Sequence, residues 1–135
     1  MKSIQLAMLG SALALTIALG ASAFAQDSPG RKELRRVDLS GAPGMEVVLS
    51  VGEYKPGDEI PVHFHHGIEA GYVLEGGTVE LPGKPPFALP TGAPIMNLRD
   101  APHAGWTVVG DKTIRLVTVH VVDKGKPLYD AVKKQ

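Results

Sequence analysis

Apolar residues in this chain recur in short runs that are separated by turns containing Gly and Pro. From Met45 onward the runs are rich in β-branched residues and show no helical periodicity. Strand-length runs at this spacing are typical of an antiparallel sandwich or barrel. We therefore predict an all-β domain, with strands expected over 45–51, 60–65, 72–74, 78–81, 86–89, 95–98, 103–109 and 113–122.

The N-terminal segment, 1–25, has a different pattern, which is typical of a secretory signal peptide. Lys2 gives a short positive region, the stretch 6–19 is mostly apolar, and Ala23-Phe24-Ala25 resembles a cleavage site. A membrane anchor would need about 20 strongly apolar residues, and polar and small residues interrupt this segment. We expect cleavage after Ala25 and a periplasmic or secreted mature chain, with no membrane association after cleavage.

The rest of the chain, from Gln26 to Gln135, suits one domain with a single core. Its first part, 26–36, is polar and contains a basic cluster, which predicts a flexible N-terminal arm with a first edge strand near Val37. The domain is expected over 37–127. The segment 128–135 is expected to form a short tail or helix, since only Pro127 to Lys134 could be helical.

Charge and cysteine content exclude several classes of function. The chain has 14 basic and 14 acidic residues and no basic patch, so we expect no nucleic-acid partner. It has no Cys, which excludes disulfides, thiolate-bound metals and a cysteine nucleophile.

His63, His65 and Glu69 are the first candidates for chemistry. On a strand, residues two apart point to the same face, so both imidazoles should leave one side. A hairpin folded at His66-Gly67 would then bring the Glu69 carboxylate beside them. Two imidazoles and a carboxylate are three of the parts of a metal site.

The spacing around these residues resembles the first motif of the cupin family. Gly57, five residues, His63-x-His65, three residues, Glu69, six residues and Gly76 match it at every position. The resemblance spans roughly Arg36 to Pro127. It implies a double-stranded β-helix barrel of the jelly-roll kind, with a metal on its inner face.

A second stretch resembles the second cupin motif less closely. Gly92 and His103 fall in register, whereas Leu98, Asp100 and Thr107 replace the Pro, Gly and Asn of the pattern. Asp tolerates left-handed turn geometry better than most residues, so the replacement at Asp100 is tolerable.

The resemblance implies that His103 joins His63, His65 and Glu69 as the fourth metal ligand. Such a set suits one divalent transition metal (Fe, Mn, Zn, Ni or Co) and disfavours Ca²⁺. On a six-coordinate ion, four protein ligands leave two positions for water or a chelating substrate. The competing interpretation is that these histidines are ordinary strand residues.

Other residues are expected to play lesser roles. His66 should be a solvated turn residue, and His120 a packed or edge residue whose face carries Ile114, Leu116, Thr118 and Val122. Tyr72 and Trp106 are out of phase with the ligands and should pack outside the pocket, in a core or subunit contact. Strand parity places Gly71, Val73 and Gly105 on the pocket side. Asn97, a polar residue in an apolar strand, is expected to make a hydrogen bond in the pocket, and Arg99 and Asp100 are expected at its rim.

Two classes of function remain open at this stage. The first is a metal-dependent enzyme that acts on a small molecule. The family resemblance implies dioxygenase-like chemistry, and isomerase or lyase chemistry is the second choice. The second is a non-catalytic module that binds a metal or a small ligand, because cupins host both. No paired carboxylates, catalytic Lys or nucleophilic triad is visible, so no catalytic residue is assigned. The expected partners are a small-molecule ligand and, in a homodimer, a second copy of the chain.

Overall fold

The computed structural model describes residues 28–132, and within them every regular element is a strand. The expected all-β class is therefore confirmed. The strands are β1 Arg31–Asp38, β2 Met45–Tyr54, β3 Glu59–Ile60, β4 His63–Phe64, β5 Gly67–Glu75, β6 Gly77–Glu80, β7 Phe87–Leu89, β8 Pro94–Asn97, β9 Trp106–Val109, β10 Ile114–Asp123 and β11 Asp130–Ala131.

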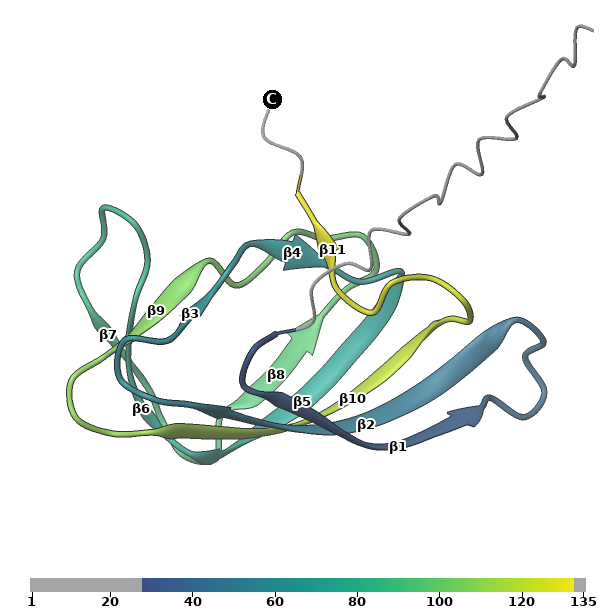
Figure 1. Cartoon of the computed structure of the whole chain (residues 1–135), viewed down its shortest axis with the longest axis horizontal. Helices are drawn as coiled ribbons and strands as arrows, with labels where there is room; N and C mark the ends of the chain where they lie inside the picture. Colours follow the sequence, from purple (N-terminus) through teal and green to yellow (C-terminus); the bar gives the residue numbers. More distant parts are fainter. Residues whose placement is uncertain (1–27, 133–135) are drawn as a thin grey trace, which may run out of the picture.

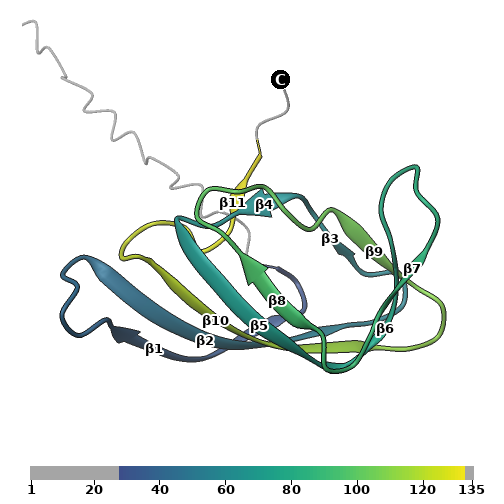
Figure 2. The same ribbon diagram turned by 180° about the vertical axis from the view of Figure 1, so that it is seen from behind.

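The strands form two antiparallel sheets and a short pair that together surround one interior. The larger sheet has the order β1-β2-β10-β5-β8, and the smaller has the order β3-β9-β6-β7. In Figures 1 and 2 the larger sheet curves along one side of the molecule, and the β4–β11 pair lies across the interior from it. This arrangement places β4, which carries His63, across the interior from the sheet that contains β5.

Alternating burial along the two longest strands shows which side chains point inward. On β2 the buried positions include Glu46, Val48, Ser50 and Tyr54. On β10 they are Ile114, Leu116, Thr118, His120 and Val122. Successive strand residues point to opposite faces, so these residues line the inside of the barrel.

The interior has an apolar part and a polar part. The apolar core consists of Tyr54, Ile60, Val73, Val79, Val108, Ile114 and Leu116. Trp106 packs edge-on against Tyr54, with ring centroids 5.7 Å apart. Beyond this core most of the buried side chains are polar or ionisable, among them Ser50, His65, Glu69 and His120. Buried polar groups are costly unless they are paired, so this part of the barrel marks the functional region.

Both predicted termini of the domain need correction. The flexible arm expected over 26–36 is wrong from Arg31 onward, because β1 pairs with β2 from Arg31↔Gly52 to Asp38↔Glu46. The segment 128–135 was expected to be a short tail or helix, and neither fits the part of it that the structure describes, because β11 pairs with β4 there. β1 gains its backbone hydrogen bonds from the next strand, β2, whereas β11 gains them from β4, which is distant in the sequence. Neither pairing can be read from the local pattern of the segment itself. The expected signal peptide lies outside the described residues.

The hairpin expected at His66-Gly67 is a crossing between sheets instead. β4 pairs with β11, whereas β5 pairs with β10 and β8. A Cβ at Gly67 would lie 2.1 Å from the carbonyl oxygen of Val121, so only glycine allows the chain to enter the large sheet here. Within the described part of the chain, no helix is long and apolar enough to span a membrane.

Candidate metal centre

The structure brings His63, His65, Glu69 and His103 together inside the barrel. His63 is on β4 and Glu69 on β5, whereas His65 and His103 lie outside the named strands. A short antiparallel bridge joins His63 and His103, with backbone N···O distances of 3.2 and 2.9 Å. The Asp100 amide donates to the carbonyl of His65 at 2.9 Å. Asp100 has φ 57°, so the left-handed geometry expected at this position is confirmed.

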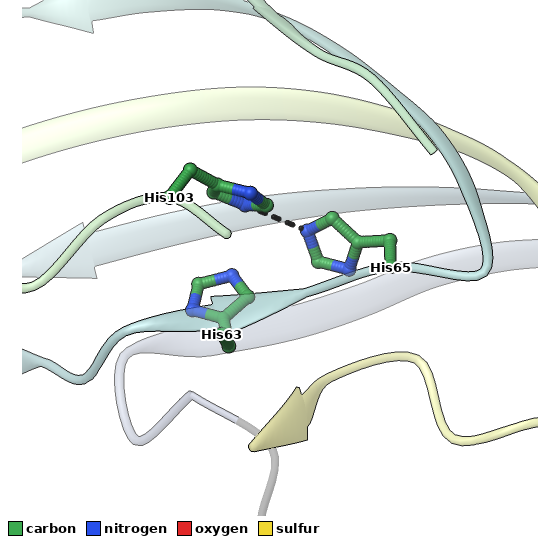
Figure 3. A group of neighbouring side chains, drawn as sticks. All are labelled: His63, His65 and His103. Atoms are coloured by element: carbon green, nitrogen blue, oxygen red, sulfur yellow. Dashed lines mark hydrogen bonds between the residues drawn. The ribbon is translucent and has the colours of Figure 1, made fainter. Parts of the chain in front are cut away.

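Each of the three histidines is oriented by a backbone carbonyl. The Nδ1 atoms of His63, His65 and His103 lie 2.8, 2.5 and 2.9 Å from the carbonyl oxygens of Pro61, Leu128 and Ala101. A carbonyl only accepts, so each Nδ1 carries the proton and each Nε2 has a free lone pair. Outer contacts of this kind fix tautomer and ring orientation in metal-binding histidines. Figure 3 shows the three rings gathered around one region, with a contact drawn between His65 and His103.

The Nε2 atoms of His65 and His103 lie only 3.1 Å apart. With both Nδ1 atoms protonated, two lone pairs face each other at this distance, which is unfavourable unless a cation or a proton lies between them. Glu69 Oε2 lies 3.4 Å from each of these nitrogens. Ligands about 2.1 Å from one ion, at right angles to each other, would be about 3 Å apart, so the spacing suits coordination.

Glu69 is held by its neighbours on both adjacent strands. In the sheet register, Glu69 on β5 lies opposite Asn97 on β8 and opposite His120 on β10. The Asn97 amide nitrogen donates to Glu69 Oε2 at 2.6 Å, so the expectation that Asn97 makes a hydrogen bond in the pocket is confirmed. On the other side, His120 Nε2 lies 3.5 Å from Glu69 Oε1.

Burial and close contact shift the pKa values of the cluster. Burial would raise the pKa of Glu69, but the His103 and His65 rings that face its carboxylate outweigh burial and hold that pKa below its ordinary value. Burial also acts to lower the pKa of His103, but the facing Glu69 carboxylate favours the protonated ring, outweighs burial and raises that pKa. Burial lowers the pKa of His63 to about 4. The site therefore combines a carboxylate that stays ionised with a His63 imidazole that favours its neutral, metal-binding form.

Two groups of donors in the described chain have the spacing of a metal site. The ring nitrogens of His63, His65 and His103 lie within 4.8 Å of one another. The donor atoms of His65, Glu69 and His120 do so as well. Imidazole and carboxylate donors are ligands of divalent transition metals, so the buried cluster could hold such an ion.

A cavity of about 170 Å³ opens directly onto the cluster. His63, Glu69, Asn97 and His103 contribute polar atoms to its wall. The rest of the wall is mainly apolar and aromatic: Tyr54, Ile60, Leu89, Ile95, Ala104, Trp106, Leu116 and Tyr129. A concave, mostly apolar pocket with a few convergent polar groups is the usual form of a small-molecule site.

The expectation that Trp106 packs outside the pocket is wrong, because Trp106 lines the cavity. Ala104 and Gly105 have φ of 62° and 76°, and this left-handed segment breaks strand parity between His103 and Trp106. Tyr72 does lie outside, with 49% of its surface exposed.

The two glycines that parity places on the pocket side, Gly71 and Gly105, do not open space there. A Cβ at Gly105 would lie 2.5 Å from a methyl of Val62. A Cβ at Gly71 would lie 2.9 Å from the carbonyl of Val117 and 3.1 Å from Thr118. Both glycines therefore permit close packing rather than a wider pocket.

Two residues near the site were not predicted to belong to it: Tyr129 was not singled out in the sequence, and His120 was expected only to be a packed or edge residue. Tyr129, in the segment expected to be a tail, is buried, and its ring centroid lies 4.5 Å from that of His63 and 4.9 Å from that of His65. A single aromatic residue in a polar tail was the available signal. His120 is packed as expected, yet it contacts Glu69 instead of being a bystander.

His66 lies outside the cluster, as predicted. Its two ring nitrogens face Asp100 and Asp130, each at 3.2 Å, in a partly exposed position. Arg99 forms a bidentate salt bridge with Asp123 on the surface: Nη1 and Nη2 donate to Oδ2 and Oδ1 at 2.9 and 2.8 Å.

Comparison with known proteins identifies the fold. No protein-family model and no curated protein matches the sequence. Among solved structures, a conserved Klebsiella pneumoniae protein with a double-stranded β-helix domain is 17% identical, with TM-score 0.56 over 81% of this chain and 92% of that one.

Two enzymes are among the similar structures. The polyketide cyclase RemF from Streptomyces resistomycificus is 29% identical, with TM-score 0.51 over 80% of this chain and 77% of that one. A chain from the structures of the DMSP lyases RdDddP and RnDddQII is 24% identical, with TM-score 0.51 over 64% of this chain. The match covers 44% of that lyase chain, so this protein spans less than half of its length. Together with the strand order, the likeness to the Klebsiella protein shows that the chain has a double-stranded β-helix fold, as its first motif predicted.

Proposed function

We propose that this protein is a metal-dependent enzyme that acts on a small oxygen-bearing organic molecule. His63, His65, His103 and Glu69 would hold one divalent transition metal. The observation that carries the proposal is the orientation of three imidazoles by three backbone carbonyls, which leaves their Nε2 lone pairs free beside one carboxylate. Metal-binding histidines are usually oriented by contacts of this kind.

The donor set fits iron, manganese, cobalt, nickel or zinc. When bound, a metal of this class can polarise an oxygen atom, acidify a water molecule or, if it is iron, react with dioxygen. Four protein donors leave room for further ligands on a six-coordinate ion. The residues around the site determine what can enter.

The protein's own side chains would bind and orient the substrate. The aromatic and aliphatic wall of the 170 Å³ cavity excludes water and accepts a compact apolar group. Asn97 keeps Glu69 Oε2 in place by donating to it. The Glu69 carboxylate, whose pKa is held low, stays ionised at neutral pH.

A dioxygenase-like oxidation is the first reaction class we propose. A substrate with two oxygen atoms could bind the metal through both of them, while the apolar wall of the cavity would contact its carbon skeleton. The second candidate is a non-oxidative reaction such as cyclisation or elimination. The 29% identity with a polyketide cyclase over 80% of this chain favours this candidate.

Metal binding can be tested directly by elemental mass spectrometry and by melting with and without chelator. A metal present at about 100 times its dissociation constant stabilises the folded state by about 2.7 kcal/mol. For a domain of this size that corresponds to about 10–20 °C in melting temperature. Indifference of the wild-type protein to both chelator and added metal would contradict the proposal.

The reaction class can be tested with the Fe(II)-loaded and Zn(II)-loaded proteins. Oxygen uptake with catechols, thiols or 1,3-diketones, absent in Glu69→Ala, would support oxidation. Turnover without oxygen, by both metal forms, would support the second candidate. Tight ligand binding with no turnover under either condition would instead identify a non-catalytic binding module.

A further inference from the structure

His120 is the most unusual buried side chain near the site. It is 0% exposed, and neither ring nitrogen has a hydrogen-bond partner among the described residues. An imidazole buried without partners loses its hydration without compensation, which is costly. An aliphatic residue would fill the same strand position without this cost, so packing alone does not account for His120.

The position of His120 in the sheet is specific. It lies directly opposite Glu69 on β5, and Asn97 lies opposite Glu69 on the other side. Three polar side chains thus form one row across three neighbouring strands, with the carboxylate in the middle. On the far side of His120 the row continues with the apolar Val48.

The two oxygens of Glu69 face different groups. Oε2 faces His65 and His103 at 3.4 Å each and accepts from Asn97. Oε1 faces His120 Nε2 at 3.5 Å. Carbonyl oxygens place the ring protons of His65 and His103 on Nδ1, whereas no such acceptor faces Nδ1 of His120 among the described residues. A carboxylate only accepts hydrogen bonds, so a hydrogen bond from His120 to Glu69 requires the proton on His120 Nε2.

We propose that His120 is a positioning residue: in the metal-bound protein its Nε2 would donate to Glu69 Oε1, which it faces at 3.5 Å, and Glu69 would bind the metal through Oε2. This inference rests on the proposed metal site. With Oε1 held by His120, Glu69 binds through one oxygen rather than two. One coordination position then stays open for substrate. Partners of metal-binding carboxylates that act in this way change metal affinity by about 10–100-fold when removed.

The geometry argues against His120 as an ordinary fourth imidazole ligand. His120 has donor atoms within 4.8 Å of His65 and Glu69, whereas His63, His65 and His103 form a separate group of three at this spacing. His120 also has no backbone carbonyl partner, among the described residues, of the kind that orients the other three rings.

Three variants test the proposal, with metal affinity measured by competition with a chromophoric chelator. His120→Leu removes the donor and keeps an apolar group in the core. His120→Gln restores an N–H donor. Thr118→Val is the matched control, because Thr118 is a buried polar residue on the same face of β10 and lies opposite Gly71 instead of Glu69.

We expect His120→Leu to weaken Co(II) binding by about 10–100-fold and to shift the Co(II) absorption spectrum, as Glu69 changes its coordination. His120→Gln should recover much of both, and Thr118→Val should match the wild type. Unchanged affinity and spectrum in His120→Leu would overturn the inference. A wild-type protein that binds no Co(II) would instead contradict the proposed function itself.

The number of coordinated imidazoles provides a second readout. Nδ1–H groups that donate to carbonyls exchange slowly, so the proton NMR spectrum of the Co(II) protein should show three strongly shifted exchangeable signals. If His120 is a positioning residue, all three signals should remain in His120→Leu. A fourth such signal that disappears in this variant would show that His120 is a ligand and overturn the proposal.

Discussion

At the scale of single residues, neighbouring histidines in the motif have different environments. His65 is fully buried and its Nδ1 faces the carbonyl of Leu128, whereas His66 is partly exposed between two aspartates. Three of the ligand-like residues were predictable because their motif is a short continuous stretch that ends at Glu69. The contribution of His120 was not, because it depends on strand register with a residue far away in the sequence.

The contrast between His63 and His66 gives the first prediction. His63→Ala should abolish the change in melting temperature between metal-loaded and chelator-treated protein, because an oriented imidazole is lost. His66→Ala is the matched control and should retain the full response. Differential scanning fluorimetry measures both. An equal response in the two variants would show that His63 does not bind the metal.

At the scale of elements, the C-terminal segment completes the site. Leu128 supplies the carbonyl that orients His65, Tyr129 packs on His63 and His65, and β11 pairs with β4. Most strands could be predicted from alternation and turns in the sequence. The pairing of β11 could not, because a two-residue strand is defined only by its partner.

Ending the chain after Pro127 should weaken metal binding by about 10-fold or more, since the His65 acceptor and the Tyr129 cover are lost together. A chain that ends after Val132 keeps both and serves as control. Chelator competition measures the affinity of each. Equal affinities would show that the segment covers the site without supporting it.

The close packing of β5 against β10 gives a further prediction. Gly71→Ala would place a Cβ 2.9 Å from the carbonyl of Val117 and 3.3 Å from Ile95, where the backbone of β10 would have to shift. Overpacking of this kind typically costs about 1–3 kcal/mol. Urea unfolding of the metal-free protein should show this loss. A neutral result would mean that β5 and β10 separate more readily than their register suggests.

At the scale of the whole molecule, the barrel combines an apolar half with an ionisable half. The fold class could be predicted because strand patterning and turn residues agree along the domain. The boundary between the two halves could not, because inward-facing positions such as Ser50 and His120 alternate like core residues.

Export is a property of the whole molecule that we propose from the pattern of its N-terminal segment, 1–25. Expression of the full chain in a bacterium with a secretory pathway should yield a periplasmic form that begins at Gln26. Intact-mass analysis of the periplasmic fraction measures this. Recovery of a membrane-bound form that retains Met1 would contradict the proposal.

The final prediction concerns acid stability of the metal-free protein. Burial lowers the pKa of both His63 and His120 from 6.5 to about 4. Between these pH values the unfolded chain binds more protons than the folded one, so the free energy of unfolding must rise with pH. The slope is at most about 1.4 kcal/mol per pH unit for each group.

Two other groups in the cluster shape the same curve. The raised pKa of His103 gives stability that is present below pH 6.5 and is lost as the pH rises through its folded value. The lowered pKa of Glu69 gives stability that is present above pH 4.5 and is lost as the pH falls toward its folded value. Stability should therefore peak near neutral pH and fall most steeply between about pH 6.5 and 4.

Urea unfolding in the presence of chelator, at a series of pH values from about 4.5 to 7.5, measures this curve. His120→Leu removes one of the two groups with a strongly lowered pKa, so it should reduce the slope between pH 6.5 and 4 by about half. The Thr118→Val control should keep the wild-type slope. A wild-type curve that is flat in this range would show that protons enter the barrel without disrupting it, and that His63 and His120 are less buried in solution than in the structure.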